Sequence, residues 1–326
     1  MSGRAIARAV LGSAVSIVAL ALVLRSVDVE RTVDVLRAAA PSWIALVAVF
    51  ITADVLVRAV RWRRLLAPIR SVAYRPMLGY LLVGYLANNV LPARLGELVR
   101  SHYLGDREGM SRTTTLGTVV VERVVDTAVV VAIAAAAILV LNVRGVVTDA
   151  VAVGVAIAAL LVVGLAVGVA AHRLPGSDTI AQRAARWPRV GELAAKLRDG
   201  LAVAGRPRTL VEALTLSVVA WGATLLAFAA AGQAVGLELR LGEAALLSSG
   251  VALASAIPAG PGYLGTYELA AVKIAEALGI PVDPAFAMAL VVHASILILT
   301  SAGGTIALAR LGWRRRPEVA TATAER

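Results

Sequence analysis

Six long stretches of apolar residues divide this chain of 326 residues. They cover residues 9–24, 43–60, 116–141, 150–171, 210–235 and 285–309. The hydrocarbon core of a bilayer is about 30 Å thick, and a helix needs roughly 20 apolar residues to cross it. One such stretch could be a buried helix of a soluble protein, but six could not. The pattern therefore predicts an all-α, polytopic membrane protein with about six full transmembrane helices.

Two further apolar stretches are shorter and are interrupted by glycine and proline. The first covers 77–104 and breaks at Pro92, and the second covers 244–278 and breaks at Pro258. Apolar segments of about 10–14 residues are candidates for re-entrant structure. We therefore predict two re-entrant helical hairpins, each of which returns to the side of the membrane from which it entered.

The two broken stretches also resemble each other. Gly84 precedes Pro92 by the same spacing that separates Gly250 from Pro258, and Pro-Ala, Leu-Gly and a glutamate follow in the same order. Interrupted apolar segments at corresponding positions of two halves indicate a transport site. Since the hairpins would enter from opposite sides, we interpret them as an inverted repeat. Chance similarity between two loops rich in glycine and proline is the alternative.

The basic residues are concentrated in alternate connectors. The net charge is +11, and residues 58–75 hold six arginines without an acidic residue. Residues 172–208 and 310–326 are also basic, whereas the other connectors are neutral or slightly acidic. By the positive-inside rule, this predicts a multi-pass plasma-membrane protein with both termini in the cytoplasm. We expect one transmembrane domain at 1–313, a cytoplasmic surface helix near 177–204 and a cytoplasmic tail at 314–326.

Composition argues against several other classes of function. Topology accounts for the basic excess, so nucleic acid is not an expected partner. The chain has no cysteine, and its three histidines lack the spacing of metal ligands. It has no P-loop and no Ser-His-Asp pattern. We therefore expect neither a metal nor a cofactor, and no catalytic activity.

The first candidate site surrounds the break in the first hairpin. A helix that restarts after a break directs its first amides toward that break, which favours an anion there. A Glu–Arg pair that only closes the helix end is an equally good interpretation. The candidates are Asn88, Asn89, Pro92, Arg94, Glu97 and Arg100.

Buried charge marks two more candidate sites. Glu122, Arg123 and Asp126 lie early in an otherwise apolar span, where each ionisable group costs roughly 2.5–3.5 kcal/mol to insert and so needs a partner or a function. They could pair with Arg94 or Arg100, or could carry a coupling proton. The third site is Asp54, Arg58 and Arg61 near the inner end of the second span, where topology alone or a lipid headgroup explains the arginines equally well.

The fourth candidate is the loop of the second hairpin. Gly260, Gly262 and Gly265 match a dinucleotide-binding pattern by letter, but that pattern requires a strand before it and a βαβ unit around it. We expect these glycines instead to let the backbone turn and approach another segment or a ligand closely. Pro258 and Glu268 complete this group.

At these residues the chain resembles the flippase-like family known from the transmembrane region of lysylphosphatidylglycerol synthases. The resemblance covers about residues 5–310, and its most specific stretch runs from Gly84 to Arg100. The other matching stretches are Arg58-x-x-Arg61-Trp62, Glu122-Arg123-Val-Val-Asp126 and Pro258-x-Gly-Pro-Gly-Tyr-Leu-Gly265-x-x-Glu268. The chain departs from the pattern at Pro261, where many relatives carry glycine. It also ends at Arg326, without the aminoacyl-transferase domain of the bifunctional synthases.

The resemblance implies a membrane domain that moves or binds lipids. Relatives act on an aminoacylated anionic phospholipid or on a lipid-linked sugar precursor. We therefore expect a lipid flippase or transporter whose partners are membrane lipids with an anionic headgroup. Two alternatives remain: an enzyme that handles a polyprenyl-phosphate carrier, and an accessory subunit of a separate envelope-modifying transferase.

Overall fold

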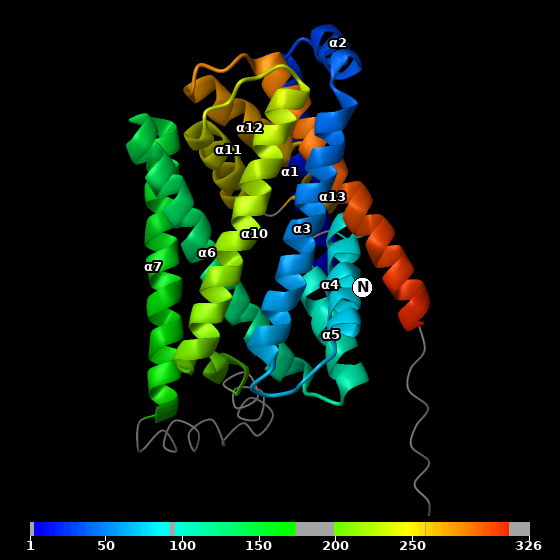
Figure 1. Ribbon diagram of the computed structural model, residues 1–326, viewed down its shortest axis with the longest axis vertical. Helices are drawn as coiled ribbons and strands as arrows, with labels where there is room; N and C mark the ends of the chain where they lie inside the picture. Colours follow the sequence, from blue (N-terminus) through cyan, green and yellow to red (C-terminus); the bar gives the residue numbers. More distant parts are fainter. Residues whose placement is uncertain (1–2, 92–94, 174–198, 258, 313–326) are drawn as a thin grey trace, which may run out of the picture.

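The computed structural model describes residues 3–91, 95–173, 199–257 and 259–312, and these form an all-helical bundle (Figure 1). Pro92, Arg94, Pro258 and the predicted tail 314–326 lie outside the described residues. The same holds for most of the predicted surface helix 177–204. Its last residues lead into a short 3₁₀ helix, η1 (Ala202–Gly205).

Within the part of the chain that the structure describes, five helices are long and apolar enough to cross a membrane. They are α3 (Pro41–Leu66), α6 (Arg112–Leu141), α7 (Val146–Arg173), α10 (Pro207–Ala234) and α13 (Val282–Leu311). Each corresponds to one of the predicted spans, so those predictions are confirmed. Most of the helices extend past the apolar stretch because polar and basic residues continue the helix at its ends. Helix α6, for example, begins four residues before its apolar stretch. Ser111 caps this start, because its side chain accepts a hydrogen bond from the backbone amide of Thr114.

The N-terminal region contains a helix for which no prediction was made. Helix α1 (Gly3–Ser26) contains the first predicted span, and α2 (Val29–Ala38) lies in the connector that follows it. The two helices meet at an angle of 84°, and together they make a sixth candidate span. Asp28 starts α2 by accepting hydrogen bonds from the amides of Glu30 and Arg31. A charged stretch of ten residues therefore forms a capped helix.

Two helical hairpins occupy the predicted positions. The first consists of α4 (Tyr74–Val90) and α5 (Gly96–Glu108). The second consists of α11 (Leu241–Ala254), the 3₁₀ turn η2 (Pro261–Tyr263) and α12 (Thr266–Ala277). The hairpins lie in opposite halves of the molecule, with their turns directed toward its middle (Figure 1). Each of these α-helices is too short to cross a bilayer alone, since the longest, α4, has 17 residues. This is the arrangement that an inverted repeat predicts, and re-entry into a bilayer stays a prediction.

The matching glycines have the same role in the two hairpins. A Cβ on Gly84 would lie 3.0 Å from the carbonyl oxygen of Gly96, where α4 meets α5. A Cβ on Gly250 would lie 2.5 Å from the side chain of Ile274, where α11 meets α12. Each glycine therefore allows the first helix of its hairpin to approach the second closely.

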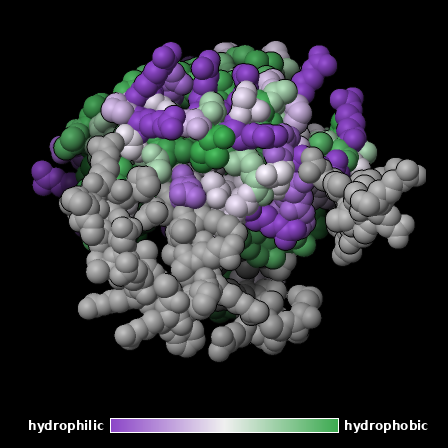
Figure 2. Space-filling view, turned by 90° about the horizontal axis from the view of Figure 1, so that it is seen from below, coloured by the Kyte–Doolittle hydropathy of each residue, from purple (hydrophilic) through white to green (hydrophobic). Residues whose placement is uncertain are grey.

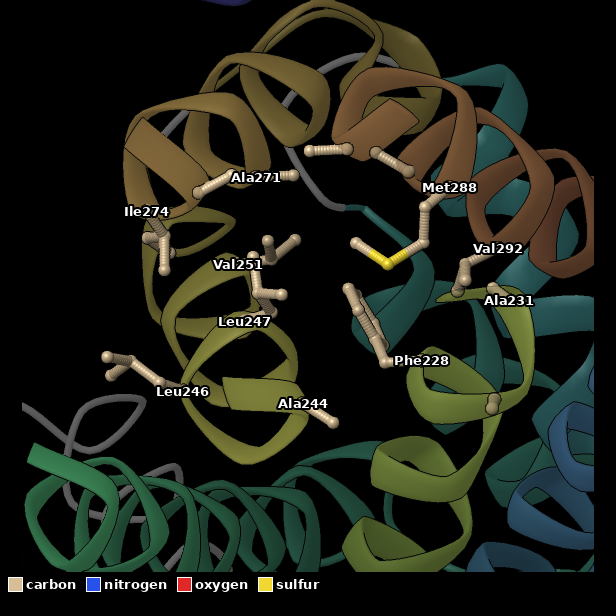
Figure 3. Close-up of a cluster of buried hydrophobic side chains, with 14 of the residues drawn as sticks. Phe228, Ala231, Ala244, Leu246, Leu247, Val251, Ala271, Ile274, Met288 and Val292 are labelled. Carbon is tan, nitrogen blue, oxygen red and sulfur yellow. The ribbon is translucent and has the colours of Figure 1, made fainter. Parts of the chain in front are cut away.

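The largest apolar core lies around the second hairpin. Phe228 from α10 and Met288 from α13 point toward Val251 and Leu247 of α11, with Ala271 of α12 on the other side (Figure 3). Alanine is the commonest residue of this cluster, which lets α3, α6, α7, α10, α11, α12 and α13 pack at short distances. The second hairpin therefore packs against α6 and α10 through α11 and against α13 and α1 through α12.

One end of the molecule is polar and basic. The C-terminal ends of α3 and α5 and the N-terminal ends of α6 and α10 meet there (Figure 1). Seen from this end, hydrophilic side chains spread over much of the face that the described residues form (Figure 2). Arg63, Arg64, Arg112 and Arg208 lie on these helix ends. Their position agrees with the predicted inner side, and the orientation itself stays a prediction.

Candidate functional site

Arginines and carboxylates from α3, α5 and α6 form a buried ionic cluster. Asp126 of α6 is its centre, because it contacts both Arg58 and Arg61 of α3. Arg58 Nη1 lies 3.1 Å from Asp126 Oδ2, and Arg61 Nη2 lies 3.0 Å from the same oxygen. Arg61 Nη1 also contacts Asp126 Oδ1. The indole of Trp221 donates a further hydrogen bond to Asp126 at 3.2 Å.

The two arginines that contact Asp126 make further hydrogen bonds to residues of α3 and α10. Asp54 accepts a 2.7 Å hydrogen bond from Arg58 Nε, one turn along α3. Thr224 of α10 donates to Asp54, and Ser217 accepts a 2.7 Å hydrogen bond from Arg61. Arg61 has no exposed side-chain surface. A charge at such a site must be paired, and these contacts supply the pairing.

Glu122 connects α5 to this cluster. Its carboxylate lies 3.2 Å from Arg100 of α5 and 3.1 Å from Arg61 of α3. Arg100 is buried and stacks over the ring of Trp62 at 4.6 Å. The expected pairing of Glu122 with Arg100 is therefore present, whereas Asp126 pairs with the arginines of α3. Arg100 has the geometry of an ion pair that closes the hairpin onto α6.

Arg123 differs from the other arginines of the cluster. Its side chain is 45% exposed, compared with 9% for Arg58, 3% for Arg100 and none for Arg61. It contacts Glu122 at 2.6 Å and Asp126 at 3.4 Å. Arg123 is thus anchored in the cluster on one side and open on the other. Four arginines face three carboxylates here, so the ionic cluster has a net charge of +1 when all are ionised.

The exposed side of Arg123 faces a cavity of about 260 Å³ between the two hairpins. Both hairpins and the helices α3, α6, α10 and α13 contribute to its wall. Its polar and titratable lining consists of Asp54, Arg58, Tyr85, Asn88, Asn89, Glu97, Arg123, Trp221, Thr224, Ser248, Ser255, Tyr263, Tyr267, His293 and Thr300. Residues from separate predicted sites therefore line one cavity.

The turns of the two hairpins meet at this cavity. A Cβ on Gly262 would lie 3.6 Å from the carbonyl oxygen of Asn89, at the end of α4. The amide of Asn89 donates 2.9 Å hydrogen bonds to Thr300 and Ser301 of α13. Both hairpins and the long helix α13 are thus joined within a few ångströms of each other.

The N-terminus of α5 is already occupied by a side chain. Asn88 Oδ1 accepts a 2.7 Å hydrogen bond from the amide of Gly96. This contact stabilises the restart of the helix after the break, as a capping side chain does. The amide of Gly96 is therefore not free to bind an anion in this conformation. Glu97 lines the cavity beside it.

The glycines of the second hairpin serve mainly to pack against α1. The amide of Gly260 donates a 2.9 Å hydrogen bond to Ser16. A Cβ on Gly265 would lie 2.5 Å from the carbonyl oxygen of Ser16, and Gly265 also has a φ of +87°. The sequence left open whether these glycines allow a close approach to another segment or to a ligand. Gly260 and Gly265 allow a close approach to α1.

Glu268 forms a second buried polar contact, with a histidine that the sequence did not single out. His293 Nδ1 lies 2.5 Å from Glu268 Oε1, and Nε2 lies 2.7 Å from the carbonyl oxygen of Gly262. Tyr267 stacks on the imidazole at a centroid distance of 4.1 Å. Both members of the pair are 3% exposed as whole residues.

The sequence also gave no direct signal for Trp221, Thr224, Ser217 and Tyr85. Such residues are ordinary in apolar helices, and only the packing of α4 and α10 against α3 brings them to the site. His293 carried a usable signal, since it is an ionisable group near the middle of a long apolar span. Among the described residues, no group of three His, Cys, Asp or Glu side chains is placed to hold a metal ion.

Comparison with known proteins agrees with this architecture. A family model, the lysylphosphatidylglycerol synthase TM region, matches residues 9–304. A curated relative, named glycosyltransferase AglD, from Haloferax volcanii, is 28% identical over 90% of this chain. The chain spans about half the length of that relative, since the alignment covers 53% of it. No solved structure matches the chain. The match extends from α1 almost to the end of α13, and this multi-pass membrane chain belongs to the family of the lysylphosphatidylglycerol synthase transmembrane region.

Proposed function

We propose that this chain moves a lipid with an anionic headgroup across the plasma membrane through the cavity between the hairpin turns. The observation that carries the proposal is the position of Arg123. It is the arginine of the ionic cluster with a half-exposed side chain, and it faces the place where the two hairpins meet. The acyl chains would stay in the bilayer while the headgroup passes.

Electrostatics support an anionic headgroup. The ionic cluster holds one more positive than negative charge, which offsets the carboxylate of Glu97 in the same cavity wall, and guanidinium groups bind phosphate through paired hydrogen bonds. The neighbouring amides of Asn88 and Asn89 and the hydroxyl of Thr224 line the same cavity. A phosphate that enters the cavity would contact the guanidinium of Arg123 at the cavity wall. The phosphate would then not be buried as an unpaired charge.

A lipid-linked sugar is a second candidate for the cargo. The relative from Haloferax volcanii is named a glycosyltransferase, and this chain aligns with about half of it. A polyprenyl phosphate presents the same anionic group to Arg123 as a phospholipid does. In this version the chain would hold or deliver the carrier lipid for a separate transferase.

Proteoliposomes containing the purified chain test the proposal. We expect faster movement of headgroup-labelled phosphatidylglycerol between leaflets than in protein-free vesicles, and little effect on labelled phosphatidylcholine. Arg123→Gln should slow the movement about tenfold or more, because a charge-assisted hydrogen bond contributes about 1.5–3 kcal/mol. Movement at the protein-free rate in the wild type would reject the proposal for that lipid.

Arg208→Gln is the matched control. Arg208 also pairs with a glutamate, Glu212, but its side chain is 91% exposed at the start of α10. We expect this variant to move lipid at the wild-type rate. A labelled polyprenyl phosphate in the same assay distinguishes the two cargoes, and thermal unfolding of each variant shows whether the fold is intact.

A further inference from the structure

Glu268 and His293 form a buried ionisable pair that the proposed headgroup path does not use directly. Glu268 lies in the first turn of α12, and its other oxygen accepts a 2.7 Å hydrogen bond from the amide of Gly265. His293 lies in α13 and lines the cavity, as does Tyr267. An ionisable pair at this depth needs a reason beyond packing, since apolar residues would fill the space at lower cost.

The partners of the imidazole fix how many protons the pair holds. Nε2 faces the carbonyl oxygen of Gly262, which only accepts hydrogen bonds, so Nε2 carries a hydrogen. Nδ1 faces a carboxylate oxygen, and a hydrogen bond there requires one more proton between the two groups. The pair in this conformation therefore holds that shared proton, as imidazolium and carboxylate or as imidazole and carboxylic acid.

Loss of the shared proton would change the structure at the hairpin turn. With Nε2 still donating to Gly262, a neutral imidazole would present the lone pair of Nδ1 to the carboxylate of Glu268. Two acceptors at this distance repel, so the ring or the carboxylate would have to move. Gly262 is the residue whose backbone lies beside Asn89 of the first hairpin. Proton loss is thus linked to the contact between the two hairpins.

Several other titratable or charged groups face the same space from the surrounding elements. Tyr267 of α12 stacks on the imidazole, and Tyr263 of η2 lies beside it in the cavity wall. Across the cavity lie Asp54 and Arg58 of α3, Tyr85 of α4, Glu97 of α5 and Arg123 of α6. The wall residues from α10 and α11 carry no ionisable group.

We propose that Glu268 and His293 are a proton-binding site, and that lipid movement through the cavity is coupled to release and uptake of their shared proton. In the release step the proton passes to water in the opened cavity. It leaves a carboxylate on Glu268 and a neutral imidazole with hydrogen on Nε2. The coupling deepens the proposed function and rests on it, whereas the proton site itself can be tested alone.

A pH gradient across the proteoliposome membrane tests the coupling. Movement of labelled phosphatidylglycerol is followed together with the pH inside, reported by a trapped dye. We expect the rate to differ severalfold between the two gradient directions, with a pH change that accompanies lipid movement. In Glu268→Gln the rates should become equal for both directions, and the accompanying pH change should disappear.

Glu243→Gln is the matched control. Glu243 is also a buried glutamate in the first turn of a hairpin helix, where it accepts a 2.8 Å hydrogen bond from the amide of Arg240. It lies outside the cavity lining, so this variant should keep the gradient dependence. Equal wild-type rates in both directions, or a gradient dependence that survives Glu268→Gln, would overturn the coupling and leave the proposed function standing.

Nitrogen NMR of histidine in the purified, detergent-solubilised chain tests the proton site without transport. His293→Gln assigns the signal. We expect a proton shared between Nδ1 of His293 and Glu268 beside the hydrogen on Nε2, seen as a hydrogen-bonded Nδ1 signal that changes when Glu268→Gln removes the carboxylate. An Nδ1 signal without such a hydrogen bond, or one that Glu268→Gln leaves unchanged, would overturn the site. If the shared proton is present but no lipid moves, the proposed function fails and the proton site stands.

Discussion

Asp126 shows how much of the architecture depends on single buried charges. It contacts Arg58, Arg61, Arg123 and Trp221, and so connects α3, α6 and α10. In a low-dielectric interior, removal of one charged partner leaves the charges of the other partners uncompensated, which is strongly destabilising. The cluster therefore orients Arg123 and also holds three helices together.

Asp126→Asn tests this dual role. The asparagine keeps the shape of the side chain but removes the charge shared by two buried arginines. We expect a loss of about 3–5 kcal/mol in the free energy of unfolding. Denaturant unfolding in detergent, followed by tryptophan fluorescence, measures it.

Asp106→Asn provides the comparison. Asp106 binds Arg112 at 2.7 Å, but its side chain is 44% exposed, and the guanidinium of Arg112 holds its pKa below the usual value. Because solvent screens this pair, we expect a loss of at most about 1 kcal/mol. If both substitutions lowered the free energy of unfolding equally, the buried contacts of Asp126 would contribute no more to stability than an exposed ion pair does.

At the scale of elements, hydropathy predicted most of the fold. Apolar length gave the spans, and the glycine and proline pattern gave both hairpins at nearly their observed bounds. Hydropathy could not reveal α2, since a short amphipathic helix depends on its cap at Asp28 and on packing against its neighbours. It also could not tell which helix supplies the partners of Asp126, because that choice follows from the pairing of α3 with α6 and α10.

The contact between Gly84 and Gly96 makes a prediction at the same scale. A Cβ on Gly96 would lie 2.1 Å from the carbonyl oxygen of Gly84, so even alanine requires α4 and α5 to separate. Gly96→Ala should lower stability by about 1–3 kcal/mol or more, as overpacked interiors do. Thermal unfolding in detergent measures this change.

Gly164→Ala is the control for that substitution. Gly164 lies in α7, where no atom is within 4 Å of an added Cβ. Alanine is the better helix former by about 0.8–1.0 kcal/mol, so this variant should be as stable as the wild type or slightly more stable. Equal destabilisation by both variants would contradict close packing as the reason for Gly96.

For the whole molecule, the sequence predicted two hairpins and several separate groups of candidate residues, and the structure adds that Gly262 of the second hairpin lies beside Asn89 of the first. Asn88, Asn89, Glu97, Arg123 and Gly262 were predicted as members of separate groups. They share one cavity or its edge because α13 and α6 bring the two hairpins together. Such convergence depends on long-range packing, which spacing along a chain does not encode. His293 was missed although its position in a long apolar span carried a usable signal; only its partner Glu268 depends on the packing.

Passage of the headgroup through the cavity requires the two hairpins to move relative to each other, and a reversible cross-link between them tests this most directly. The natural chain has no cysteine, so Asn89→Cys with Gly262→Cys places a single thiol pair at the contact. A bifunctional methanethiosulfonate reagent should arrest movement of labelled phosphatidylglycerol in proteoliposomes, and reduction should restore it. The single variants treated in the same way are the controls, and the reagent should slow neither of them below its own untreated rate. Unchanged lipid movement in the fully cross-linked protein would contradict passage of the headgroup between the hairpins.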